Sequence, residues 1–222
     1  MNEQERAEEH LKTIRRLMER ATIYRAISAP TALVGGLLSL IASGAYLEWF
    51  SNFPAEDSAD IYNRFLWLWL LVLVLTAGAN TIFIVAGAVK RNEPVFSASM
   101  KAALSALAPA FIAGAAFTLA WLEPGMAHKP ISLSIAWVIC YGLGLLATSH
   151  FAPRSLTLLG WAFLLSGIME MLLLGSGSHF AFIWNASIAT HAGTLFMAAT
   201  FGLFHLIYAA CAWPREDTAP EM

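Results

Sequence analysis

Six stretches of predominantly apolar residues constrain this chain more than any other feature of its sequence. Each stretch reaches the roughly 20 residues that an α-helix needs to cross a hydrocarbon core about 30 Å thick. We therefore predict an all-α integral membrane protein, in which residues 29–213 form a compact bundle of six transmembrane helices. The expected spans are approximately 31–50, 65–89, 101–122, 131–149, 155–175 and 183–212.

The composition agrees with this class and excludes others. Hydrophobic residues make up 58% of the 222 residues and charged residues 13%, which is about half the charged fraction of a typical soluble domain. The basic residues are scattered and the formal net charge is −2, so nothing indicates a nucleic-acid-binding surface. The partner that the composition implies is the lipid bilayer.

The distribution of Lys and Arg predicts the orientation. If the N-terminus is cytoplasmic, only Arg64 and Lys129 fall outside, and all other Lys and Arg residues fall on the cytoplasmic side. By the positive-inside rule, both termini are then cytoplasmic. We expect a plasma membrane location in a bacterium, with residues 214–222 forming a disordered tail.

Residues 1–28 have the pattern of an amphipathic helix. Apolar residues recur at alternating steps of four and three, with charged residues on the other face. The favoured interpretation is an interfacial helix that lies on the membrane and leads into the first span. The alternative is a helix through which residues 2–27 bind a protein partner or a second copy of the chain. The apolar positions are Ala7, Leu11, Ile14, Met18 and Ala21.

The last span combines the length of a membrane helix with two histidines. Its polar and small residues follow one another at steps of three or four, so they share one helical face. Because polar groups in hydrocarbon normally turn toward protein or a water-filled cavity, we expect this face to point into the bundle. The residues of the face are Ser187, His191, Thr194, Ala198, Gly202 and His205.

Glu170 is the only acidic residue well inside a predicted span, and Ser166 lies one turn further in on the same face. A short loop joins spans five and six, so we expect Glu170 to lie near His191, about 12 Å below the outer end of span six. Burying an ionisable group in a membrane costs a few kcal/mol, which makes this outer polar site a functional hypothesis. The alternative is that Glu170 is protonated or hydrogen-bonded and only fixes the helix register. The proposed ligand or ion pathway comprises Glu170, His191, Ser166, Thr194 and Asn80.

Two further positions in the spans have more than one interpretation. Asn80 lies one turn after Thr76 in span two, where an interhelical hydrogen bond is favoured over contact with a solute. Pro109 lies in the middle of span three and cannot donate to the carbonyl of Ser105, so we expect a kink there. This kink is either structural or a hinge that gates the pathway.

Aromatic residues mark the outer ends of the first two spans. Tyr46 and Trp49 close span one, and Trp67 and Trp69 open span two. Tyr and Trp are enriched at membrane interfaces, so we interpret these residues as an interfacial belt. A ligand-binding mouth is the less favoured alternative.

A metal site is a weak hypothesis. Glu170 and His191 would need further ligands from the outer loops, and His128 and His179 are the residues available there. Zinc sites usually show closely spaced ligands, and neither an HxxxH nor an HxxE pattern is present.

A haem site is a second weak hypothesis. His191 and His205 are fourteen residues apart, close to four helical turns, which resembles the spacing of two-haem helices in cytochrome b-type proteins. Those proteins need a matching pair of histidines on another helix, and here the only other histidine at a predicted span is His150. Its depth differs from that of His205 by roughly 10 Å. A hydrogen-bonded buried histidine is therefore favoured for His205, and no cofactor is firmly indicated.

Enzymatic motifs are not found. Ser166-Gly167 with His191-Ala192-Gly193 resembles the serine and histidine motifs of rhomboid proteases, but Leu164 replaces the glycine of that family and the helix order differs. No HExxH motif, paired aspartates or nucleotide-binding loop occurs elsewhere. A transporter or channel-like protein is thus favoured over an enzyme. The alternatives are a non-transporting partner or sensor subunit that uses the N-terminal helix, and a haem protein.

Overall fold

The computed structural model describes residues 4–6, 8–14, 29–52, 58–92, 95, 98–120, 130–150, 152–175 and 191–213. Within these ranges all regular elements are helical, and six helices are long and apolar enough to cross a membrane. The first five are α2 (Ala29–Asn52), α3 (Ser58–Arg91), α4 (Ala98–Ala120), α5 (Pro130–Ala147) and α6 (Arg154–Gly175). The sixth span is continuous and consists of α8 (Ala192–Met197), the π-helix η2 (Ala198–Phe204) and α9 (His205–Ala212).

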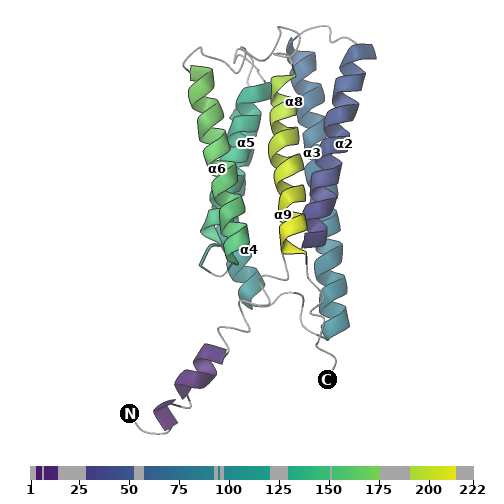
Figure 1. Ribbon diagram of the computed structural model, residues 1–222. Helices are drawn as coiled ribbons and strands as arrows, with labels where there is room; N and C mark the ends of the chain where they lie inside the picture. The colour runs from purple at the N-terminus through teal and green to yellow at the C-terminus, as the bar shows by residue number, and fades with distance from the viewer. Residues whose placement is uncertain are drawn as a thin grey trace.

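The helices lie side by side in an elongated bundle, with the sixth span between α5 and α6 on one side and α2 and α3 on the other (Figure 1). We call the end where α2 finishes and α3 begins the Tyr46 end, and the opposite end the Lys90 end. Because the number of crossings is even, α2 begins and α9 finishes at the Lys90 end. Lys90, Lys101 and Arg154 also lie there. The cytoplasmic orientation of this end stays a prediction.

The helix bounds follow the predicted spans closely except in two places. Helix α3 begins at Ser58 rather than near residue 65, because the acidic segment before the apolar run continues the helix. The last helix begins at Ala192 rather than near residue 183. The predicted tail at 214–222 and most of the predicted amphipathic segment lie outside the described residues. The described part of that segment, 4–6 and 8–14, is helical.

Small residues allow the helices to approach closely. A methyl group on Gly142 of α5 would lie 2.7 Å from the backbone nitrogen of Leu164 on α6. One on Gly202 of η2 would lie 2.6 Å from Leu40 of α2. In lipid, where hydrophobicity does not drive helices together, such close packing is a main source of association. Helix α5 packs mostly against α6 and α4, and α2 against α3 and the sixth span.

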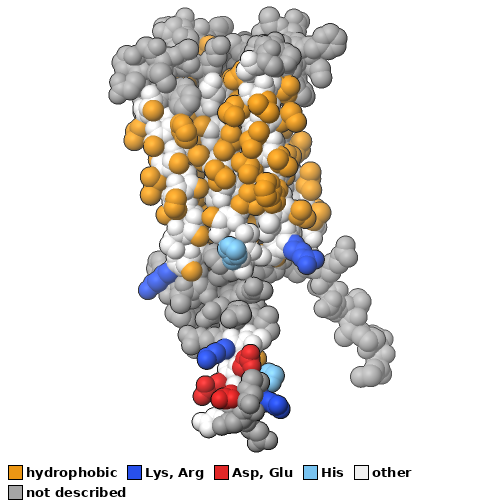
Figure 2. All heavy atoms as spheres, turned by 90° about the vertical axis from the view of Figure 1, so that its left-hand side faces the viewer, with side chains coloured by type: hydrophobic (Ala, Val, Ile, Leu, Met, Phe, Trp, Pro, Cys, Tyr) orange, Lys and Arg blue, Asp and Glu red, His pale blue; other side chains and the backbone are white. Residues whose placement is uncertain are grey.

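The surface of the bundle suits a hydrocarbon environment. Apolar side chains cover the visible face of the spans, and Lys and Arg side chains lie near its lower margin (Figure 2). The exposed large side chains include Leu71, Val74 and Ile82 of α3 and Ile112 of α4. Helix α4 continues through Pro109, which is itself exposed on this outer surface, and its role as a hinge stays a prediction.

Candidate functional site at the Tyr46 end

His191 precedes the first turn of α8, with φ −103° and ψ 0°. It therefore lies at the end of this helix, and not two turns inside it as predicted from the sequence. Its imidazole meets the ring of Tyr46 on α2 edge-on, with ring centroids 6.3 Å apart and an interplanar angle of 86°. Burial lowers the pKa of His191 below its ordinary value, because the charged imidazolium loses hydration. The site thus holds a titratable group that prefers to be neutral.

The residues after His191 fix the sixth span against two other helices. A methyl group on Gly193 would lie 2.8 Å from backbone atoms of Pro130 and Ile131, so only glycine permits this approach to α5. Thr194 is buried, and its carbonyl oxygen lies 3.5 Å from the Ser43 hydroxyl of α2, which donates at 2.8 Å to the Ser39 carbonyl of its own helix. His191 is consequently placed where the sixth span meets both α2 and α5.

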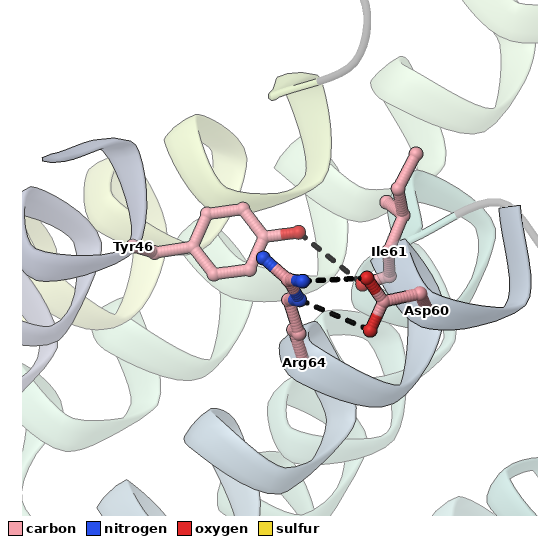
Figure 3. A network of polar contacts seen from close by, with 4 residues as sticks. All are labelled: Tyr46, Asp60, Ile61 and Arg64. Atoms are coloured by element: carbon pink, nitrogen blue, oxygen red, sulfur yellow. Dashed lines mark hydrogen bonds and ion pairs between the residues drawn. The ribbon is translucent and has the colours of Figure 1, made fainter. Parts of the chain in front are cut away.

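A polar network joins the end of α2 to the start of α3 (Figure 3). The Tyr46 hydroxyl donates to the carbonyl of Ile61 at 3.3 Å. Arg64 makes two contacts with the carboxylate of Asp60, at 2.6 and 3.0 Å, and its guanidinium lies 5.1 Å from the centre of the Trp49 ring. This network was not predicted from the sequence, although the i,i+4 spacing of Asp60 and Arg64 is a signal for it.

Aromatic side chains pack next to this network, on its side toward the Lys90 end. Phe65 meets Tyr46 edge-on at 6.3 Å, stacks on Trp137 of α5 at 6.1 Å, and lies 6.1 Å from Trp69. Trp67 is 69% exposed and fits the predicted interfacial belt, whereas Trp69 is 3% exposed. Tyr46 is 1% exposed, so the belt interpretation was wrong for both Tyr46 and Trp69. We call Tyr46, Phe65, Trp69 and Trp137 the aromatic cluster.

Glu170 and Ser166 lie on α6. The Ser166 hydroxyl donates to the carbonyl of Phe163 in its own helix at 2.9 Å. Helix α6 meets the sixth span at η2 and α9, whereas the main neighbour of α8, which follows His191, is α5. The pairing of Glu170 with His191 stays a prediction.

Asn80 lies in another part of the bundle. Its side-chain oxygen accepts a 3.0 Å hydrogen bond from the Thr31 hydroxyl at the start of α2. This is the interhelical hydrogen bond that the sequence favoured. Along α3, Asn80 is about 22 Å from Phe65 at 1.5 Å per residue, so the structure does not bring it to the aromatic cluster.

His205 is held by hydrogen bonds at both ring nitrogens. Nδ1 lies 2.9 Å from the carbonyl oxygen of Phe201, and Nε2 lies 2.8 Å from the hydroxyl of Tyr141 on α5. A carbonyl only accepts, so Nδ1 carries the proton and Nε2 accepts from Tyr141. The rings of Phe163 and Phe201 pack against the imidazole at 5.4 and 5.9 Å. Sequence reasoning missed Tyr141, whose only signal is a hydroxyl in the middle of an apolar span.

The π-helix separates the two histidines of the sixth span. A π-helix uses i to i+5 hydrogen bonds, so each of its turns takes up more residues than an α-turn. The sequence prediction of one shared face assumed an uninterrupted α-helix, which the π-helix between the two residues is not. His191 contacts α2, whereas His205 contacts α5 and α6.

These contacts also bear on the metal and haem hypotheses. Binding iron at His205 would require one of its two hydrogen bonds to be broken, and His150 lies exposed in the turn after α5. Among the residues that the structure describes, no three His, Cys, Asp or Glu side chains are placed to hold a metal ion. His128 and His179 lie outside the described residues, so the zinc-like site stays a prediction.

Comparison of the chain with models of protein families, with curated proteins and with solved structures finds no match. The class of protein therefore follows from the six apolar helices alone. They define an all-α polytopic chain with the dimensions of an integral membrane protein.

Proposed function

We propose that this chain is a small transporter or channel-like membrane protein whose pathway begins at the Tyr46 end. The observation that carries the proposal is the position of His191, a half-buried titratable side chain where the sixth span meets α2 and α5. Placing a titratable ring against two helices at the end of a membrane span removes part of its hydration at a cost, and a role in binding or moving a cation or proton offsets that cost. The Tyr46 end then faces outward and the Lys90 end faces the cytoplasm of a bacterium.

The other pathway residues have distinct roles in this proposal. Thr194 and Ser166 contribute hydroxyl groups, and Glu170 supplies the negative charge that a cation or a protonated His191 would need. Asn80 lies further along, toward the Lys90 end, where it hydrogen-bonds to Thr31. Pro109 is the proposed hinge of α4, because it removes one backbone hydrogen bond inside the helix.

A flux assay in proteoliposomes tests the proposal. An imposed membrane potential should drive proton or cation entry, read from a pH-sensitive dye inside the vesicles or from entry of a labelled cation. His191→Ala and Glu170→Gln should reduce the flux to the level of protein-free vesicles. His150→Ala is the matched control, because His150 is exposed and lies at the opposite end. If both pathway variants conduct like the wild type, the proposed pathway has no role.

A second candidate function is a membrane partner or sensor subunit. It is favoured by Leu11 and Ile14, which lie one turn apart on the N-terminal helix and are 66% and 53% exposed. In this case residues 2–27 bind another protein and the bundle serves as an anchor. Deleting these residues should abolish recovery of the complex in pulldowns and leave the thermal unfolding of the bundle unchanged. Unaltered recovery would exclude this function.

A further inference from the structure

Four helices surround the aromatic cluster at the Tyr46 end. Helix α2 packs against α3, α3 against α5, α5 against α8, and α8 against α2, so the four form a ring. Within this circle of four helices, the aromatic side chain of Tyr46 is contacted from two sides. Phe65 of α3 contacts it on one side, and His191, which precedes α8, contacts it on the other. Side chains one turn further from this end therefore lie at a common depth inside the ring.

Trp69 is one of these side chains. It follows Phe65 by about one turn and is 3% exposed, and its indole nitrogen is buried without a hydrogen-bond partner among the described residues. An indole N–H is a donor only, so it needs an acceptor. Leaving a buried donor unsatisfied costs about 1–3 kcal/mol. The position thus calls for an acceptor that comes from outside the described chain.

Thr194 lies at the same depth on another helix. It follows His191 by three residues, is 1% exposed, and has a buried hydroxyl with no partner in the described part of the chain. Its carbonyl oxygen lies 3.5 Å from the Ser43 hydroxyl, which places Thr194 beside α2. Trp69 and Thr194 therefore present two buried polar groups to the same interior layer.

Several comparable groups elsewhere in the bundle have partners. The indole N–H of Trp137 donates to the Thr118 hydroxyl at 2.9 Å. The buried hydroxyls of Thr148 and Thr200 donate to carbonyls of their own helices at 2.7 and 2.8 Å. The buried Thr76 hydroxyl, about two turns further along α3, also has no partner among the described residues. Trp69 and Thr194 differ from it because the two lie at a common depth on two helices of the same ring.

We propose that the Trp69 indole N–H and the Thr194 hydroxyl bind a small hydrogen-bond acceptor, a water molecule or a monovalent anion, one turn below Tyr46. Both ligands present the same chemistry, a compact acceptor for an N–H and an O–H donor. The inference goes beyond the proposed function, because a bundle that transports nothing would still need this acceptor. If the protein does transport, the site lies directly below His191 on the pathway.

Nuclear magnetic resonance of the full chain in lipid nanodiscs tests the site. The indole nitrogens are labelled with ¹⁵N, and the resonances of Trp69 and Trp137 are assigned with Trp69→Phe and Trp137→Phe. The protein is studied first with gluconate as the only anion and then with chloride. Trp137 is the matched control, because it is a partly buried indole with a partner from the protein.

The expected result is a Trp69 indole proton that is shifted downfield and either shows a cross-peak to water or moves on addition of chloride. A water cross-peak without a chloride response identifies water as the ligand, and a chloride response identifies an anion. Thr194→Val, which keeps the side-chain shape, should abolish that signal and leave Trp137 unchanged. A wild-type Trp69 proton with neither signal, or a signal that survives Thr194→Val, would overturn the shared site.

Discussion

The two histidines of the sixth span lie in contrasting surroundings. His205 has a hydrogen bond at each ring nitrogen and packs among Tyr141, Phe163 and Phe201. His191 stands at the helix start, where its ring meets Tyr46 edge-on. One region resembles the satisfied core of a soluble protein, and the other combines a titratable ring with buried polar groups. Under the proposed function, structural and functional roles are divided between the two ends of one helix.

The π-helix between them explains how one helix serves both regions. Its extra residue per turn rotates His205 toward α5 and α6 while the residues after His191 stay against α2 and α5. Gly202 lies within the π-helix and packs against Leu40 of α2, so the wide turns are held from outside as well. If the His191 and His205 regions differ in this way, substitutions in the two regions should have different effects on stability and on flux.

The largest effect on stability should come from His205→Ala. The change removes a packed ring and leaves the Tyr141 hydroxyl without its acceptor, which together cost about 3 kcal/mol. His150→Ala, at an exposed turn, should change the free energy of unfolding by no more than about 0.5 kcal/mol. Denaturant-induced unfolding in detergent micelles measures both. Equal stability of the two variants would show that the His205 region is not a packed core.

The next largest effects on stability should come from substitutions of two glycines of the sixth span, Gly193 and Gly202. Gly193→Ala should cost about 2 kcal/mol, because the added methyl group meets backbone atoms of α5 at 2.8 Å that cannot move aside. Gly202→Ala should cost about 1 kcal/mol, because the methyl group meets the flexible end of Leu40. Gly78→Ala, with nothing within 4 Å, is the control. The reverse order in unfolding experiments would argue against the close approach of α8 to α5.

Removal of single hydroxyl groups should have a smaller effect. Tyr141→Phe breaks a 2.8 Å hydrogen bond and should cost about 1 kcal/mol. Tyr46→Phe breaks a longer contact of 3.3 Å to Ile61 and should cost about half as much. The same unfolding assay compares them. A greater loss of unfolding free energy for Tyr46→Phe than for Tyr141→Phe would show that the stronger of the two hydrogen bonds is the one at the Tyr46 end, contrary to the structure.

The smallest effect should be a dependence of stability on pH that arises from His191. Its pKa in the folded chain lies below the ordinary value of 6.5, so above that pH the ring is neutral in both the folded and unfolded states. As the pH falls through 6.5, the unfolded chain binds a proton more readily, and stability decreases. His191→Gln should flatten this decrease in thermal unfolding recorded between pH 8 and pH 5. An unchanged slope would mean that burial does not disfavour the charged ring.

Sequence patterns predicted the six helices well because the length of an apolar run is set by the membrane itself. They failed where tertiary contacts decide. The segment before Phe65 looked like an acidic loop, yet Asp60 and Arg64 pair across one helical turn. A π-helix has no sequence pattern comparable to an apolar run, so the faces of His191 and His205 could not be assigned. The burial of Trp69 depends on which helices surround it, and no single helix encodes that.

A flux comparison between His191→Gln and Tyr141→Phe tests the central claim most directly, namely that the Tyr46 end carries the function and the His205 region carries structure. Both variants are reconstituted at equal amounts of folded protein, and proton or cation entry is measured under the same potential. We predict that His191→Gln loses the flux of the wild type and that Tyr141→Phe retains it. Retained flux in His191→Gln with lost flux in Tyr141→Phe would contradict the division of roles between the two ends.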